Sequence, residues 1–157
     1  MRLFDLKNKV IIVTGSSGGN GSAITRGLKD SGAIVIEADL PDCDITSNKD
    51  LDQLIENAIS HNGTIDGLVN CAGVTYGNNI FDYSEDDWEN TYKINLKAPF
   101  ELSRKVAKIM KKTGGSIINI TSLNAELAFP NNPAYVAFKG GLKQLTKALA
   151  LDLGQYN

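Results

Sequence analysis

Runs of apolar residues alternate along the chain with segments in which apolar residues recur every three or four positions. The apolar runs are rich in β-branched residues, suit strands buried on both faces of a parallel sheet, and predict strands at 9–14, 33–38, 65–71 and 116–121. The spaced pattern predicts helices at 20–31, 49–60, 84–112 and 134–153. Strands that alternate with helices predict an α/β fold in three layers, in which helices cover both faces of a parallel sheet.

Two segments depart from this alternation. Residues 40–46 are too few for a helix, so we expect a turn with a vestigial strand around 43–45, which makes 116–121 the fifth strand. Pro99 lies inside the long helical pattern and predicts a bend or a break, because proline lacks a backbone N–H. We find no internal repeat and no linker, so residues 1–157 are expected to form one domain.

Composition and charge exclude several classes of protein. With 42% apolar and 22% charged residues, the chain is neither disordered nor of low complexity. A net charge of −2 without a basic stripe gives no electrostatic reason to expect nucleic-acid binding. The apolar runs are far too short to span a membrane. The N-terminal residues carry charges where a signal peptide needs apolar side chains. The two cysteines do not have the spacing of metal ligands, so we expect no metal site. Two free thiols are typical of a protein in the reducing cytoplasm.

The segment between the first strand and the first helix is rich in glycine and reads T-G-S-S-G-G-N-G, from Thr14 to Gly21. Glycines let the backbone turn tightly and approach a bulky anion, and the following helix start offers free N–H groups to a pyrophosphate. The spacing is G-x-x-x-G-x-G, which differs from the more common G-x-G-x-x-G of dinucleotide sites. The segment predicts a phosphate-binding turn, with a flexible turn that binds no ligand as the alternative.

Asp39 follows the second strand, where a carboxylate in a nucleotide-binding fold accepts hydrogen bonds from the adenosine ribose. A negative charge there repels a 2′-phosphate, and the nearest basic residue downstream is Lys49. Asp39 therefore predicts NAD as the cofactor and makes NADP less favoured. A solvated aspartate in a turn is the alternative, since Asp42 and Asp44 lie beside it.

Tyr135 and Lys139 are four residues apart at the start of the last helix and so share one helix face. An ammonium group near a phenol favours the phenolate, and such a pair can pass a proton to or from a carbonyl or hydroxyl group. Ser122 follows the 116–121 strand, at the edge where open α/β sheets bind ligands. An exposed Tyr-Lys pair without a catalytic role is the alternative.

Together these residues resemble the short-chain dehydrogenase/reductase family, and the resemblance covers nearly the whole chain. The family's T-G-x-x-x-G-x-G motif appears as Thr14–Gly21, and its N-N-A-G motif appears as Asn70-Cys71-Ala72-Gly73. Its helix asparagine, its serine and its Y-x-x-x-K motif appear as Asn95, Ser122, Tyr135 and Lys139. Asn20 departs from the family pattern, which usually has Ile or Leu at that position.

The resemblance implies a Rossmann-type doubly wound sheet and a role for each motif. Tyr135 would be the general acid/base, Lys139 would lower the tyrosine pKa and bond the nicotinamide ribose, Ser122 would polarise the substrate carbonyl, and Asn95 would hold a relay water. Asp44 and Ile45 would flank the adenine, and Asn70 and Gly73 would line the adenosine side. The cofactor-binding residues implied are Gly15, Ser17, Gly19, Asn20, Gly21, Asp39, Asp44, Ile45, Asn70, Ala72, Gly73, Tyr135 and Lys139.

The function implied is NAD-dependent hydride transfer between nicotinamide and a small-molecule secondary alcohol or ketone, by a homodimer or tetramer. Family members continue through two more strands and a substrate-covering segment. We therefore expect a C-terminally truncated chain, through natural truncation or proteolysis, with the 116–121 strand as an open edge. The alternatives are a truncated, inactive fragment that binds nucleotide or oligomerises, and an interaction scaffold, which would not need the Ser-Tyr-Lys set.

Overall fold

A computed structural model describes residues 5–156, so Asn157 and the first four residues of the charged N-terminal stretch lie outside the described residues. Within this range one sheet contains four parallel strands, namely β1 (Val10–Thr14), β2 (Ile34–Ala38), β3 (Gly67–Asn70) and β4 (Ser116–Asn119). The α-helices are α1 (Gly19–Asp30), α2 (Asn48–Asn62), α3 (Glu85–Tyr92), α4 (Ala98–Met110) and α5 (Pro133–Leu153). The α/β class and the parallel sheet predicted from the sequence are confirmed.

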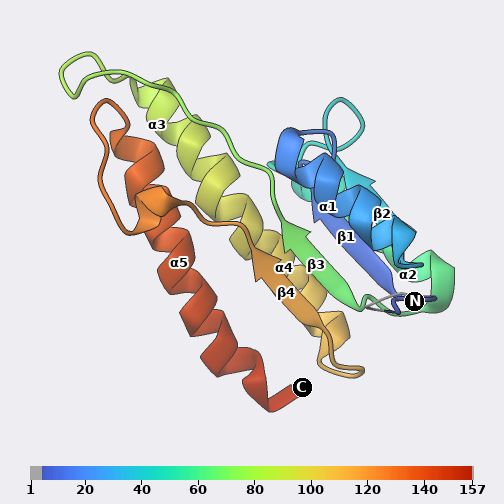
Figure 1. The fold of residues 1–157 in the computed structure, drawn as a ribbon. Helices are drawn as coiled ribbons and strands as arrows, with labels where there is room; N and C mark the ends of the chain where they lie inside the picture. The colour runs from blue at the N-terminus through green and yellow to red at the C-terminus, as the bar shows by residue number, and fades with distance from the viewer. Residues whose placement is uncertain (1–4, 157) are drawn as a thin grey trace.

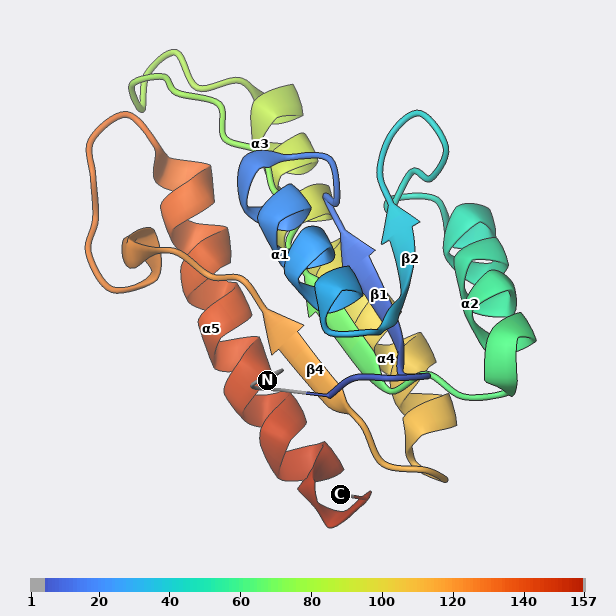
Figure 2. The ribbon, with the colours of Figure 1, turned by 45° about the vertical axis from the view of Figure 1, so that its right-hand side comes forward.

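The sheet lies between two layers of helices, with α1 on one face and α2 and α4 on the other (Figures 1 and 2). Side chains of β1 alternate between these faces. Val10 and Ile12 join a core cluster with residues of α2 and α4, whereas Ile11 and Val13 join a second cluster with residues of α1. This alternation explains why β1 reads as a continuous apolar run, since both of its faces are buried.

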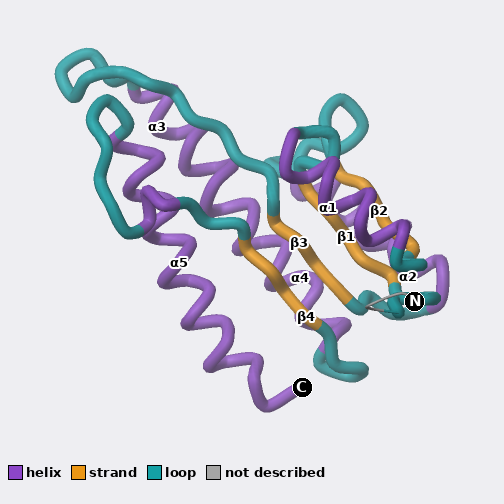
Figure 3. Tube along the Cα trace, in the orientation of Figure 1, coloured by secondary structure: helices purple, strands orange, loops and turns teal. Residues whose placement is uncertain are grey.

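In the strand order β2-β1-β3-β4, β1 has β2 on one side and β3 on the other. The chain therefore crosses to one side of β1 to form β2 and to the other side to form β3. Because all four strands are parallel, their carboxyl ends and the loops that follow them gather at one edge of the sheet (Figure 3). In open α/β sheets a ligand crevice forms at this edge, where the strand order reverses.

The vestigial strand expected around 43–45 is wrong, because the segment forms successive turns. The Cys43 amide donates to the Asp39 carbonyl oxygen at 2.9 Å, and the Ser47 amide donates to the Asp44 carbonyl oxygen at 2.9 Å. These local hydrogen bonds use the backbone groups that a strand would offer to a neighbour. Consequently β4 is the fourth strand of the sheet, not the fifth.

The long helix does not break at Pro99; its geometry changes one turn earlier. Residues Lys93–Lys97 form a π-helical turn between α3 and α4, and Pro99 lies at the start of α4. Proline is tolerated in the first turn of a helix, where its missing N–H has no partner to lose. The predicted irregularity is therefore present as a wide turn that contains Asn95.

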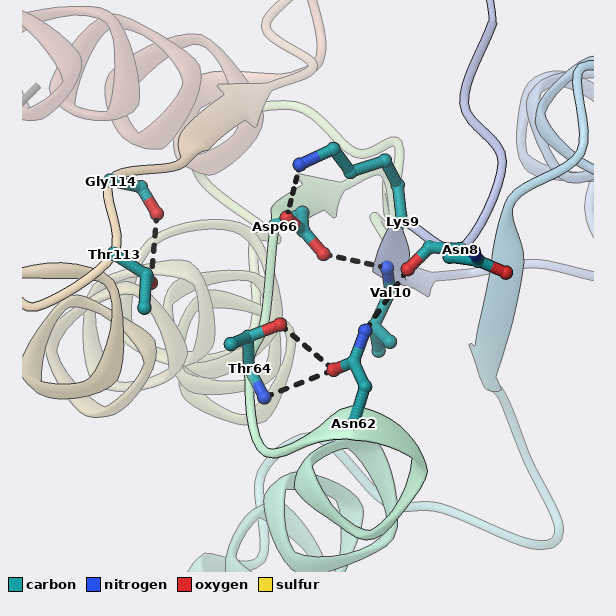
Figure 4. Close-up of polar contacts among 8 residues, drawn as sticks. All are labelled: Asn8, Lys9, Val10, Asn62, Thr64, Asp66, Thr113 and Gly114. Carbon is teal, nitrogen blue, oxygen red and sulfur yellow. Dashed lines mark hydrogen bonds and ion pairs between the residues drawn. The ribbon is translucent and has the colours of Figure 1, made fainter.

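The amino ends of the strands are joined on the side opposite the ligand edge (Figure 4). Asp66 accepts hydrogen bonds from the Val10 amide at 2.9 Å and from Lys9 Nζ at 2.8 Å. Burial raises the pKa of Asp66, but the hydrogen bonds from Lys9 and Val10 outweigh burial and hold it below its ordinary value. These contacts fix β1 beside the segment that enters β3.

The other side of the sheet is less complete. Among the described residues β4 pairs only with β3, which confirms the expected open edge. Ile118 of β4 remains 52% exposed, because α1 covers the β1 side of that face. The β4 side of the molecule therefore depends on α5 for much of its cover.

Candidate active site

The carboxyl ends of the strands enclose a cavity of about 490 Å³. The glycine-rich turn after β1, the Asp39–Ile45 segment after β2, the Cys71–Thr75 segment after β3 and the start of α5 all contribute to its walls. All of the predicted cofactor-binding residues except Asn70 line this cavity. They are Gly15, Ser17, Gly19, Asn20, Gly21, Asp39, Asp44, Ile45, Ala72, Gly73, Tyr135 and Lys139.

Two glycines of the turn are required by close backbone contacts. Gly15 has a φ of 66°, and a Cβ on it would lie 2.7 Å from the Cα of Ala72. A Cβ on Gly21 would lie 1.9 Å from the Gly15 carbonyl oxygen. The turn therefore presents bare backbone to the cavity at the start of α1, which suits the approach of a pyrophosphate.

Asp39 is held against the glycine-rich turn. Its Oδ2 accepts the Ser17 amide at 2.8 Å and also accepts the Ser17 hydroxyl, while its Oδ1 accepts the Leu40 amide at 3.0 Å. The hydrogen bond from the Ser17 hydroxyl is the main reason that the pKa of Asp39 lies below its ordinary value. A charged carboxylate thus lies at the β2 end of the cavity.

The Asp44 side chain lines the same end of the cavity and also closes its own turn. Its Oδ1 accepts hydrogen bonds from the Thr46 amide and the Thr46 hydroxyl, each at 2.8 Å. Ile45 supplies an apolar wall beside it. The short connection after β2 therefore places one carboxylate and one apolar side chain where a flat heteroaromatic ring can stack.

Tyr135 and Lys139 lie at the opposite end of the cavity, on the first turns of α5. Lys139 Nζ lies 5.7 Å from the centre of the Tyr135 ring and donates to the Ile120 carbonyl oxygen at 2.9 Å. Only 3% of Lys139 is exposed. Burial lowers the pKa of Lys139, and the nearby Cys71 thiol opposes that shift.

Asn95 lies behind the wall of the cavity, and its surface is fully buried. Its Nδ2 donates to the carbonyl oxygens of Val74 at 2.9 Å and Thr91 at 3.0 Å, while its Oδ1 has no partner among the described residues. A Cβ on Gly73 would lie 2.9 Å from Asn95 Oδ1 and 3.5 Å from Lys139 Nζ. A side chain at position 73 would therefore press on this buried acceptor and lie close to the ammonium group.

Two further predicted residues make contacts away from the cavity lining. The Asn70 side chain is 2% exposed and donates to Ser103 Oγ and Asn119 Oδ1 inside the fold. Ser122 Oγ accepts the Asn124 amide at 3.1 Å and donates to Asn124 Oδ1 at 3.3 Å. For Ser122 to donate to a substrate oxygen, its hydroxyl must leave Asn124.

Sequence reasoning missed several residues that shape the cavity. Thr14 Oγ1 accepts the backbone amides of Cys71 and Ala72, each at 3.1 Å, and so fixes the turn after β3 against the turn after β1. Val74, Thr75 and Thr121 also line the cavity. Their position in the sequence could have indicated them, because each of these residues ends a strand or follows one at the ligand edge.

Over residues 5–156, no helix is long and apolar enough to cross a membrane. No group of three or more His, Cys, Asp or Glu side chains in the described part of the chain is arranged to hold a metal ion.

The chain is similar to known proteins in sequence and in fold. Residues 36–157 match the family model described as short chain dehydrogenase. An uncharacterised oxidoreductase of Escherichia coli, YgcW, is 36% identical over 178 aligned positions that cover 100% of this chain and 68% of that protein. The ligand-free aldohexose dehydrogenase of Thermoplasma acidophilum has a TM-score of 0.89 and 33% identity, over 94% of this chain and 62% of that one.

A second solved structure gives a similar result. It is a gluconate 5-dehydrogenase from Burkholderia cenocepacia in complex with NADP and tartrate, with a TM-score of 0.91 and 30% identity, over 98% of this chain and 69% of that one. The chain therefore spans about two thirds of the length of these relatives.

Proposed function

Because the chain belongs to the short chain dehydrogenase family, a family of oxidoreductases, we propose that it takes part in hydride transfer between a nicotinamide dinucleotide and a secondary alcohol or ketone. One observation carries the proposal. The Tyr135–Lys139 pair lines the same cavity as the glycine-rich turn and Asp39. A dinucleotide needs a phosphate cradle, a ribose acceptor and a proton-transfer group in one continuous space.

The residues of the cavity fit the cofactor from end to end. Gly15 and Gly21 form a cradle that a Cβ would fill, and Asp39 offers a carboxylate to the adenosine ribose. Gly19, Asn20 and Ser17 would surround the pyrophosphate, with Asp44 and Ile45 beside the adenine. The bound nicotinamide would supply the hydride donor or acceptor.

Proton transfer is assigned to Tyr135. Its phenol would give a proton to the substrate oxygen during reduction and take it back during oxidation. Lys139 Nζ would favour the phenolate by its positive charge and hold the nicotinamide ribose. Ser122 would donate to the substrate carbonyl after its hydroxyl turns away from Asn124.

Asn95 is proposed to hold a water molecule in a proton relay to Lys139. Its buried Oδ1 has no hydrogen-bond partner within residues 5–156, which is costly unless a donor reaches it. The same acceptor and Lys139 Nζ both lie within 3.5 Å of the point that a Cβ on Gly73 would occupy. A water between them would satisfy Asn95 and connect the buried ammonium group to further waters.

NAD is proposed over NADP. The Asp39 carboxylate faces the end of the cavity where the adenosine ribose would lie, and Ser17 favours its charged form. Lys139, at the other end, is the one cation in the cavity lining over the described residues. A 2′-phosphate beside Asp39 would meet uncompensated repulsion. The Burkholderia relative was solved in complex with NADP, so this proposal predicts that the two proteins differ in cofactor preference.

The substrate class proposed is a small polyhydroxylated molecule, a sugar or a sugar acid. Relatives named for aldohexose and gluconate support this choice. Thr75, which lines the cavity, exchanges hydrogen bonds with Asn132 across the two loops near Tyr135. Hydroxyl and amide groups at this position suit a substrate that offers several hydroxyl groups.

Cofactor titration with parallel turnover assays tests the proposal. We expect NADH to quench or shift protein fluorescence with a lower Kd than NADPH, and we expect turnover with members of a panel of aldohexoses, gluconate and simple ketones. Tyr135→Phe should lower turnover by about 10²-fold or more while NADH binding persists. Tighter binding of NADPH would refute the cofactor preference, and retained turnover in Tyr135→Phe would refute the proton-transfer role.

The same experiment separates the alternatives. NADH binding without turnover of any panel member would favour an inactive nucleotide-binding fragment. If neither dinucleotide binds, the oxidoreductase proposal fails and an interaction scaffold is favoured. Self-association as a dimer or tetramer stays a prediction, for which sedimentation velocity gives a direct measurement.

A further inference from the structure

A chain of buried and half-buried hydrogen bonds crosses the molecule from α4 to α5. Asn70 Nδ2 donates to Ser103 Oγ of α4 at 3.2 Å and to Asn119 Oδ1 of β4 at 2.8 Å. Asn119 Nδ2 donates to Thr146 Oγ1 of α5 at 2.9 Å, and Thr146 Oγ1 donates to the Leu142 carbonyl oxygen at 2.7 Å. These hydrogen bonds form a relay of side chains that links β3 and β4 to α5.

Apolar packing holds α5 only weakly. Of its 21 residues, only Ala134, Lys139 and Leu142 are buried. A groove of about 300 Å³ separates part of α5 from α4 and β4, and Met110, Ile117 and Leu153 contribute to its lining. Where apolar contact is thin, individual hydrogen bonds have more influence on the position of a helix.

The relay reaches α5 on the face that carries Lys139. Residues 139 and 146 are seven apart, which is two helical turns, so they lie on the same side of α5. Successive residues of β4 and its extension hold them, since Asn119 contacts Thr146 and the Ile120 carbonyl oxygen accepts Lys139 Nζ. Two points of attachment fix both the rotation and the axial position of the helix.

We propose that Asn119 and Thr146 are positioning residues, which hold α5 on β4 so that Lys139 and Tyr135 face the cavity. The role in hydride transfer rests on the proposed function, whereas the effect on Lys139 does not. Without the Asn119–Thr146 hydrogen bond, the Ile120 carbonyl oxygen, the buried Leu142 side chain and the end near α3 remain to hold the helix. There Phe138 packs against Trp88 and Tyr92, at centroid distances of 4.9 and 5.5 Å.

The test is NMR titration of lysine side chains labelled at ¹³Cε in the chain without cofactor, with Lys139 assigned from Lys139→Arg. Thr146→Val removes one hydroxyl group at nearly constant volume, and Asn119→Leu removes the amide. In both variants α5 should loosen and water should reach Lys139, so its pKa should rise from its lowered value toward that of an ordinary lysine. Thr146→Ser keeps the hydroxyl and should restore the wild-type titration.

Thr25→Val is the matched control. Thr25 is a buried helix threonine in α1 whose Oγ1 has no hydrogen-bond partner among the described residues. The same substitution there should leave the Lys139 titration unchanged. If Lys139 titrates identically in folded Thr146→Val and wild type, the positioning role is refuted, and Thr146→Val decides the matter even if Asn119→Leu fails to fold.

NADH affinity separates this inference from the proposed function. Where wild type binds NADH, Thr146→Val should raise the Kd about threefold to tenfold, as expected for one hydrogen bond, and Thr146→Ser should not. A wild type that binds no dinucleotide would defeat the proposed function, and the Lys139 titration would still decide the positioning role.

Discussion

The two ends of the cavity are built in different ways. At the β1–β2 end, the glycine-rich turn and Asp39 are fixed by backbone contacts and by hydrogen bonds from Ser17. At the α5 end, Tyr135 and Lys139 depend on a helix with few buried residues and on side-chain hydrogen bonds to β4. The nucleotide end is therefore determined by the central strands, whereas the proton-transfer end is determined by the attachment of one helix at the sheet edge.

This difference predicts different sensitivities. Substitutions at the nucleotide end meet immovable backbone, so they should act as clashes or as changes in charge. Substitutions at the α5 end should act through loss of packing and of helix position, with a more graded outcome.

Gly21→Ala should have the largest effect. A Cβ on Gly21 would lie 1.9 Å from the Gly15 carbonyl oxygen, and two backbone segments must separate to relieve that clash. We expect a loss of stability upwards of ~3 kcal/mol and no measurable NADH binding. Urea unfolding and fluorescence titration measure the two effects. Gly27→Ala, in the same helix and away from the cavity lining, is the control, because among residues 5–156 no atom outside the helix backbone lies within 4 Å of a Cβ there. Equal losses of stability in the two variants would mean that contact with Gly15 is not what excludes a side chain at position 21.

Leu142→Ala tests the α5 end. Leu142 is 1% exposed and is the one large apolar side chain among the buried residues of α5. Its truncation should reduce the free energy of unfolding by about 2–4 kcal/mol. Leu151→Ala, on the same helix, should change it by less than about 0.5 kcal/mol, because Leu151 is 85% exposed. Equal melting temperatures for the two variants would mean that α5 is not held by its buried face.

Much of this arrangement could be predicted from the sequence. The β-branched runs predicted all four strands, and the T-G-x-x-x-G-x-G segment predicted the turn that now lines the cavity beside Asp39. The pattern of apolar residues and the spacing of glycines are sufficient for these features, because local backbone geometry determines them. The vestigial strand at 43–45 was wrong because hydrogen bonds from Cys43 and Ser47 closed turns that apolar patterning does not encode.

Other features depend on contacts between distant residues. The link between Asn119 and Thr146 joins positions 27 apart, and nothing in either local pattern indicates it. Likewise, Asn95 lies in a π-helical turn, and its Oδ1 has no partner in the described part of the chain. Pro99 predicted an irregularity in this helix but not its position or its form. Sequence spacing predicted Ser122 at the ligand edge, but it could not predict the hydrogen bonds between the Ser122 hydroxyl and Asn124.

Asp39→Ala should change the cofactor preference, with a smaller change in free energy than Gly21→Ala or Leu142→Ala. Removal of the carboxylate abolishes its repulsion toward a 2′-phosphate and its hydrogen bonds to the ribose, so the ratio of NADPH to NADH affinity should rise about tenfold. Paired fluorescence titrations measure that ratio. Asp42→Ala is the control, since Asp42 is exposed and does not line the cavity. An unchanged ratio in Asp39→Ala would remove the basis for the NAD preference.

The smallest expected effect concerns the amino ends of the strands, far from both ends of the cavity. The folded-state pKa of Asp66 lies below its ordinary value, so the folded chain binds fewer protons there than the unfolded chain. The stabilisation is complete above the ordinary carboxyl pKa of about 4 and is lost as the pH falls through the lower folded-state pKa.

Solvent screens this pair, because the Lys9 side chain is 54% exposed, so we expect a contribution of less than about 1 kcal/mol. Urea unfolding between about pH 6 and 3 should show a shallower loss of stability in Asp66→Asn than in wild type, since asparagine does not titrate. Asp30→Asn changes an exposed carboxylate at the end of α1 and should keep the wild-type slope. If Asp66→Asn keeps that slope too, acid sensitivity arises elsewhere, and Asp39, whose pKa is also lowered, becomes the next group to replace.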